Sequence, residues 1–226
     1  MNALQLFLFD IAGTVVQDHG YVRSCLADSL SAAGIPVDPA TLQAVMGRPK
    51  PVAIMRLLAA GQASPPAPAQ VEALHADYLR RINAFWRDDT RVAEIPGTLD
   101  VFAYLRKRRI MIGLETGFGR ETTDILIERL GWQKWVDGSV CSDEVARGRP
   151  HPDLGLHLMR ALGVRDPAQV AKVGDTVADL QEGAALDCAL NIGVLSGSGS
   201  RTELEKAPHT HLLSSVADIP ALLEAF

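Results

Sequence analysis

Three features of this sequence predict an α/β fold built around a parallel sheet. Short apolar runs, such as those at 4–9 and 110–114, alternate along the chain with longer segments of helical periodicity. Polar residues follow each of these runs at once. Between residue 18 and about residue 90 the pattern is helical only. Strands that alternate with helices indicate a parallel sheet covered by helices, here interrupted after its first strand by a helical insertion.

The first strand is expected at Leu4–Phe9, an apolar run without Gly or Pro that suits a strand buried on both faces. A helix over 21–33 should end at Gly34, and the next should begin with Asp38 as N-cap and Pro39 in its first turn. Two more helices are expected at 52–60 and 71–85.

The remaining elements restore the alternation of strands and helices, which predicts a core of residues 1–17 and 92–226 and an inserted helical domain of residues 18–91. Strands are expected at 110–114, 139–141, 170–175, 189–194 and 211–213, and helices at 101–107, 120–130, 153–162 and 178–185.

Composition excludes several classes of partner. The chain has 226 residues, of which 47% are hydrophobic and 22% charged, as in globular proteins with a buried core. A net charge of −5 predicts no broad attraction to nucleic acid or to an anionic membrane. The three cysteines are widely spaced without a CxxC pair, and neither a signal peptide nor a membrane span is evident. We therefore expect a cytoplasmic protein.

Polar residues at or near the predicted strand ends form a coherent phosphoryl-transfer set. Asp10 follows the first strand, and a carboxylate can attack phosphorus to form an aspartyl-phosphate. The hydroxyl of Thr116 and the cation Arg149 can hold phosphoryl oxygens. Asp175 and Asp179 add the anionic, oxygen-rich surroundings that Mg²⁺ prefers, and the ion lets two anions approach each other.

The segments FDIAGT, LETG, GRP and VGDTVADLQEG, in this order, resemble the haloacid dehalogenase superfamily, whose Mg²⁺-dependent members mostly transfer phosphoryl groups. The resemblance implies a Rossmann-like core with an α-helical cap inserted after the first motif, and a homodimer through the cap. It implies a nucleophile and metal ligand at Asp10, further metal contacts at the Ala12 carbonyl, Asp175 and Asp179, phosphoryl contacts at Thr116 and Arg149, and substrate contacts at Ala12, Gly13, Met46 and Gly117.

Two departures resemble the phosphonoacetaldehyde hydrolases within that superfamily. Ala12 stands where the phosphatases usually carry an acidic Asp, and Arg149 stands where a Lys is usual. The cap segment Met46-Gly47-Arg48-Pro49-Lys50 resembles the family segment whose Lys forms an imine with the substrate aldehyde.

Cleavage through an imine does not need the acidic Asp that Ala12 replaces. Cleaving a C–P bond leaves a carbanion, which an imine at the neighbouring carbon converts into a neutral enamine. Lys50 must lose its proton to attack, and nearby cations with desolvation can lower its pKa. We therefore expect a hydrolase that cleaves phosphonoacetaldehyde or a related 2-oxoalkylphosphonate.

Two positions depart from the phosphonatase pattern. Ala53 replaces a His that follows the Lys, and Phe118 replaces a Tyr; His75 and His151 are the candidates to substitute for the His. Two alternative functions remain. One is a phosphate-monoester phosphatase that uses Lys50 only to bind substrate, and the other is a non-catalytic phospholigand-binding module. The Gly/Ser segment 195–200 is interpreted as a flexible turn near the site.

Overall fold

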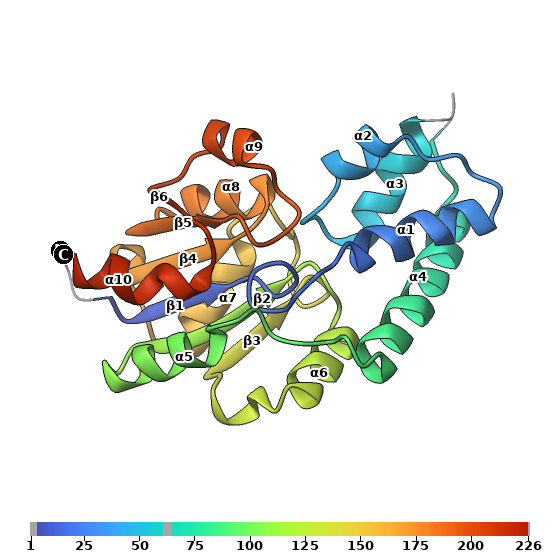
Figure 1. Cartoon of the computed structure of the whole chain (residues 1–226). Coiled ribbons are helices and arrows are strands. Elements are labelled where there is room, and N and C mark those ends of the chain that lie inside the picture. Colours follow the sequence, from blue (N-terminus) through green and yellow to red (C-terminus); the bar gives the residue numbers. More distant parts are fainter. Residues whose placement is uncertain (1–3, 61–64, 226) are drawn as a thin grey trace.

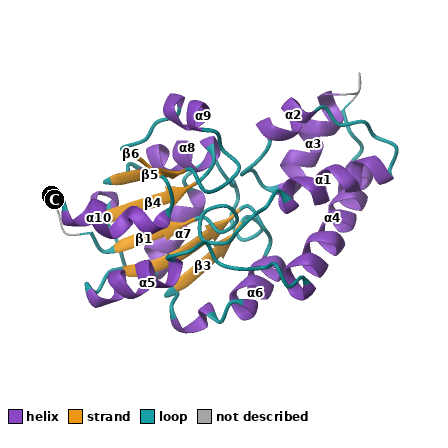
Figure 2. Ribbon diagram, in the orientation of Figure 1, coloured by secondary structure: helices purple, strands orange, loops and turns teal. Residues whose placement is uncertain are grey.

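A six-stranded parallel sheet, with helices on both of its faces, forms the centre of the structure (Figures 1 and 2). The structure is a computed structural model that describes residues 4–60 and 65–225. Its strand order is β3-β2-β1-β4-β5-β6, which confirms the predicted fold class. The strands are β1 (Leu6–Phe9), β2 (Met111–Thr116), β3 (Gly138–Cys141), β4 (Val170–Gly174), β5 (Leu190–Val194) and β6 (His211–Leu213).

Alternate residues of β1 enter two different hydrophobic clusters. Phe7 and Phe9 pack in the larger cluster with residues of α5 and α6, whereas Leu6 and Leu8 pack with residues of α7. Successive side chains of a strand point to opposite faces, so β1 is covered on both sides, as its apolar run predicted. The core helices are α5 (Thr98–Lys107), α6 (Arg120–Arg129), α7 (Asp153–Ala161), α8 (Val177–Leu186), α9 (Arg201–Lys206) and α10 (Ile219–Glu224), with 3₁₀ turns at Trp132–Lys134, Pro167–Gln169 and Val216–Asp218.

The inserted helices lie together to one side of the sheet (Figure 1). The two segments that join them to the core pair with each other: Gln17 donates its backbone N–H to Ala93 O at 3.0 Å, and Ile95 donates to Val15 O at 2.9 Å. We propose that residues 18–91 form a cap and that the rest forms the core; residues 1–3, 61–64 and 226 of these ranges lie outside the described residues. The cap helices are α1 (Tyr21–Ala32), α2 (Pro39–Ala44), α3 (Lys50–Ala60) and α4 (Pro68–Asp88).

Helix-capping residues set several of these helix ends. The Asp38 carboxylate accepts from the backbone N–H of Thr41 at 2.8 Å, and Gly34 adopts a left-handed φ of 73° after α1, both as predicted. The prediction that α3 begins at Val52 was wrong, because α3 starts at Lys50 and places Pro51 in its first turn. Lys50 is thus held at the start of a helix.

The helices within residues 4–60 and 65–225 include none that is both long and apolar enough to cross a membrane.

Candidate active site

The candidate site lies at the carboxyl ends of β1 and β4, where the chain reverses direction across the sheet. From β1 the strands proceed to β2 and β3, and the chain then returns to place β4 on the other side of β1. Such switch points are where open α/β sheets bind ligands. Asp10 directly follows β1 and Asp175 directly follows β4, and one oxygen each of Asp10, Asp175 and Asp179 lie within 4.8 Å of one another.

The Asp175 carboxylate is held by the loop after β5. Ser198 donates to its Oδ2 from the backbone N at 2.7 Å and from Oγ at 3.1 Å, and Thr14 donates to Oδ1 at 3.2 Å. Gly197 leaves room for this contact, since a Cβ there would lie 2.0 Å from Asp175 Oδ2. The segment 195–200 is therefore more than a turn near the site, because it positions a site carboxylate.

Arg149 is buried and spreads its guanidinium over the acidic cluster. Its Nη1 contacts Asp10 Oδ1 at 2.5 Å and Asp179 Oδ1 at 2.8 Å. Its Nε contacts Glu182 Oε2 at 2.9 Å, and its Nη2 donates to the backbone O of Glu115 at 2.7 Å. These contacts fix the position of the Asp10 carboxylate. That Arg149 also contacts phosphoryl oxygens stays a prediction.

A second buried cation was missed by sequence reasoning. Lys172, in the middle of β4, lies with its Nζ against the carboxylate of Glu115, 3.1 Å from Glu182 Oε2 and 3.3 Å from Asp179 Oδ1. All four side chains are fully buried. The signal was a lysine inside an otherwise apolar strand, which is rare without a charged partner.

The cluster leaves Asp10 and Asp175 short of positive charge. Burial raises the pKa of Asp10, a rise that Arg149 opposes. Burial, and then the charges of Asp10 and Asp179, raise the pKa of Asp175 well above its usual range. Burial also disfavours the charge of Asp179, but Arg149 and Lys172 outweigh it and lower that pKa. A divalent cation between Asp10 and Asp175 would relieve this repulsion, so the residues present fit a metal ion with oxygen ligands.

The cap completes the site with Lys50. One cavity of about 30 Å³, which has room for only a few water molecules, contacts both cap and core. Lys50 is 5% exposed, and its Nζ lies 5.9 Å from the ring centroid of Tyr78 and 5.5 Å from that of Phe118. Burial lowers its pKa to about 8, an effect that Asp10 and Asp18 partly offset. The cavity is lined by Asp10, Ala12, Asp18, Val22, Met46, Gly47, Lys50, Thr116, Gly117, Phe118, Arg149, Asp175, Thr176 and Ser198.

Glycines let the cap segment before Lys50 lie directly on the core. Gly47 has a φ of 78°, and a Cβ there would lie 2.3 Å from Thr176 Oγ1. A Cβ on Gly148 would lie 2.3 Å from Pro49 Cγ. The predicted substrate contact Gly13 does not line the cavity; a Cβ there would lie 2.7 Å from Asp175 Oδ2.

The structure also places the histidine candidates and one carboxylate that was not predicted. Ala53 is buried, His75 is half-buried in the wall of a neighbouring cavity that also contacts Lys50, and His151 is exposed. Asp18 lines the site cavity with Lys50, and burial raises its pKa. Its carboxylate also accepts from Val22 N at 3.0 Å, so in the sequence it resembles a helix-capping residue.

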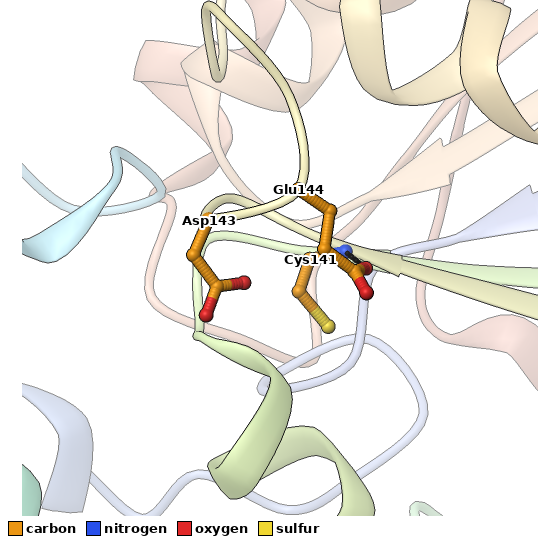
Figure 3. A group of neighbouring side chains, drawn as sticks. All are labelled: Cys141, Asp143 and Glu144. Atoms are coloured by element: carbon orange, nitrogen blue, oxygen red, sulfur yellow. Dashed lines mark hydrogen bonds between the residues drawn. The ribbon is translucent and has the colours of Figure 1, made fainter.

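A second group of side chains that could hold a metal ion lies at the end of β3 and just after it, where Cys141, Asp143 and Glu144 come together (Figure 3). Each has a protein partner. Cys141 Sγ lies 3.1 Å from Thr123 Oγ1, Glu144 pairs with Arg120 at 2.6 Å, and Asp143 accepts from Arg120 N at 3.1 Å. Burial raises the pKa of the Cys141 thiol to about 12, so without a bound metal the thiol is protonated at neutral pH. We assign no metal to this group.

Comparison with known proteins agrees with this architecture. Residues 4–187 match the family model of haloacid dehalogenase-like hydrolases. A phosphonoacetaldehyde hydrolase of Latilactobacillus sakei is 31% identical, over 100% of this chain and 89% of that protein. A solved phosphonoacetaldehyde hydrolase-like protein of Oleispira antarctica superposes with a TM-score of 0.81 at 22% identity, covering 99% of this chain and 92% of that one. CbbY of Rhodobacter sphaeroides, solved with xylulose-1,5-bisphosphate, has a TM-score of 0.80 at 21% identity, covering 95% and 96%.

Proposed function

The chain belongs to the haloacid dehalogenase-like hydrolases, and we propose that within this family it cleaves the C–P bond of phosphonoacetaldehyde or of a related 2-oxoalkylphosphonate. One observation carries the proposal: the cap delivers the buried amine of Lys50 into the cavity that also contains the carboxylate of Asp10. An enzyme that only hydrolyses phosphate esters has no need of a neutral amine there.

The first step joins Lys50 to the substrate. The neutral amine attacks the carbonyl carbon, and loss of one water gives an imine. A pKa of about 8 leaves a useful fraction of the amine neutral near neutral pH. The carboxyl of Asp18, in the same cavity, can carry the protons that this exchange moves.

The second step transfers the phosphoryl group. Asp10 attacks phosphorus, and the electron pair of the C–P bond passes into the imine, protonated on nitrogen, to give a neutral enamine. Arg149 keeps the attacking carboxylate in place, and the buried Thr116 hydroxyl can hold a phosphoryl oxygen. Water then releases phosphate from Asp10. The enamine takes a proton on carbon, and hydrolysis of the imine frees Lys50, so that one water is consumed overall.

Asp10, Asp175 and the backbone carbonyl of Ala12 are the groups that would hold Mg²⁺, with Asp179 behind them. When bound, the ion supplies positive charge that lets the phosphonate approach the Asp10 carboxylate. The fit rests on the mutual repulsion of these buried carboxylates.

A second candidate function, phosphate-monoester hydrolysis, is favoured by one observation. Asp18 is a half-buried carboxyl in the site cavity, and its raised pKa suits an acid that protonates a leaving alkoxide. In that reaction Lys50 would only bind substrate. A non-catalytic phospholigand-binding module would turn over neither class of compound.

Borohydride trapping separates these functions. With phosphonoacetaldehyde present, reduction of the imine should abolish activity and add the substrate-derived mass to the peptide that contains Lys50. Lys50→Arg keeps the positive charge but cannot form an imine, so C–P cleavage should disappear. Lys206→Arg, at an exposed lysine of α9, is the matched control. If no adduct forms, and Lys50→Arg still hydrolyses a phosphate ester, the phosphatase function is correct.

A further inference from the structure

A larger cavity adjoins the site on the other side of Lys50. Its volume is about 350 Å³, against about 30 Å³ for the site cavity, and the two share Lys50, Gly117 and Phe118 in their walls. The amine that we propose to form the imine therefore stands at the boundary between a small polar space that contains Asp10 and a larger one beyond it.

The walls of this larger cavity are mainly apolar or already paired. The cap contributes Val52, Tyr78 and Leu79 beside His75, whose pKa burial lowers, so that its ring is neutral near pH 7. On the core side the guanidinium of Arg120 binds Glu144, and Asp143 accepts from the backbone of Arg120, while Glu121 is exposed. Such a lining suits an uncharged, hydrocarbon-rich group.

We propose that this cavity, bordered by Val52, Leu79 and Ala146, binds the substituent on the carbonyl carbon of the substrate, so that the preferred substrates are ketones with an apolar group there. The inference rests on the proposed function. An imine carbon is trigonal, and its bonds to the Lys50 nitrogen and to the phosphonomethyl group occupy two of its three directions. With the phosphonate at Asp10, the third substituent must point away from the small cavity.

The size of the cavity sets the size of the substituent. A cavity of about 150 Å³ in another protein binds benzene, so about 350 Å³ accepts a butyl or phenyl group with room to spare. An aldehyde substrate, whose substituent is hydrogen, would leave this space to water. Each methylene buried in it should raise kcat/KM by roughly fourfold.

The test measures inorganic phosphate released from phosphonoacetaldehyde and from the ketone series that runs from 2-oxopropylphosphonate to 2-oxohexylphosphonate. We expect kcat/KM to rise along the ketones, a comparison that holds the reactivity of the carbonyl nearly constant. A flat or falling series, with phosphonoacetaldehyde cleaved, would overturn the assignment of the cavity alone. Release of phosphate from none of these compounds would overturn the proposed function as well.

A variant that fills the larger cavity tests the same assignment from the side of the protein. Ala146 is exposed on the loop after β3, so Ala146→Phe should fold while its ring occupies the cavity. We expect kcat/KM for 2-oxohexylphosphonate to fall by roughly tenfold or more, and the value for phosphonoacetaldehyde to change much less. Ala161→Phe, at an exposed alanine ending α7, should change neither. Equal losses for the long ketone and the aldehyde in Ala146→Phe would contradict the proposal.

Discussion

The cap and the core each bury one lysine near the candidate site, and the two side chains differ in their charge. Lys172 in β4 lies against three carboxylates. Burial acts to lower its pKa, but the charges of Glu182, Asp179 and Asp10 outweigh burial and raise it. Lys50 at the start of α3 lies beside two aromatic rings, and burial lowers its pKa to about 8. Burial is nearly complete in both, so it is the partners that decide the protonation state.

The difference in pKa between Lys172 and Lys50 indicates a structural role for the first amine and a chemical role for the second. A lysine held charged by carboxylates cannot act as a nucleophile, but it can neutralise an acidic cluster and so position Asp179 and Glu182 around Arg149. Lys50 makes no ion pair with a carboxylate among residues 4–60 and 65–225, so its charge is costly to keep, and that cost makes the neutral amine available for the proposed imine formation. The following tests either break this contrast or sharpen it.

The largest effect is expected at the proposed nucleophile, Asp10 of the core. Asp10→Asn removes the nucleophilic oxygen with almost no change in volume, so kcat should fall by roughly four orders of magnitude or more. Phosphate release measures the loss, and circular dichroism checks that the variant is folded. Asp28→Asn, at an exposed aspartate of α1, is the control. If Asp10→Asn kept about a tenth of the original kcat, Asp10 would not be the nucleophile.

The second-largest effect is expected when bound metal is removed. Exhaustive chelation should abolish turnover, because the charge between Asp10 and Asp175 is then uncompensated. Adding Mg²⁺ to the stripped protein should also raise its Tm, since a ligand that binds only the folded chain stabilises it. In Asp175→Asn the rise in Tm should shrink. Full activity after chelation would remove the metal from the mechanism.

Stability should distinguish the two lysines. In Lys172→Met, Arg149 is the remaining cation in contact with Glu115, Asp179 and Glu182 within the described residues. Removing one cation from this buried cluster should lower the free energy of unfolding by about 3–5 kcal/mol. Lys50→Met breaks no ion pair within the described part of the chain and removes a charge that is costly to bury, so stability should be unchanged or higher. Urea unfolding of both variants measures the contrast. Equal destabilisation by the two substitutions would show that Lys50 has a charged partner in solution.

The smallest effect is expected in the dependence on pH. Because Lys50 must be neutral to attack, kcat/KM for a carbonyl phosphonate should rise about tenfold per pH unit and level off near pH 8. The pKa of Lys50 in the folded protein, about 8, lies below its unfolded value of 10.5, so the unfolded chain binds the Lys50 proton more tightly. The contribution of Lys50 to the free energy of unfolding should therefore rise between about pH 8 and 10.5. A C–P cleavage rate that does not vary between pH 6 and 8 would argue against a neutral amine.

Much of the arrangement at the strand ends followed from the sequence alone. Parallel strands bring their carboxyl ends to one edge, so polar residues that follow apolar runs, such as Asp10 and Asp175, were expected to meet, and the structure places them together. The roles assigned to them remain predictions. Helix boundaries were predictable where Gly34 or Asp38 carried capping chemistry. The helices α9 and α10, six residues each, are too short to show helical periodicity and were not predicted.

What the tertiary structure decided was which charges share a buried space. Nothing in the local sequence of Lys172 pairs it with Glu115, which is distant along the chain, because such contacts arise only when β2 and β4 pack on either side of β1. The same holds for Lys50. Its sequence motif located an amine in the cap, but its depressed pKa depends on its burial where cap and core meet, and Tyr78 of α4 and Phe118 of the core lie beside the amine. A side chain's identity is local information, whereas its desolvation and its partners are properties of the packed fold.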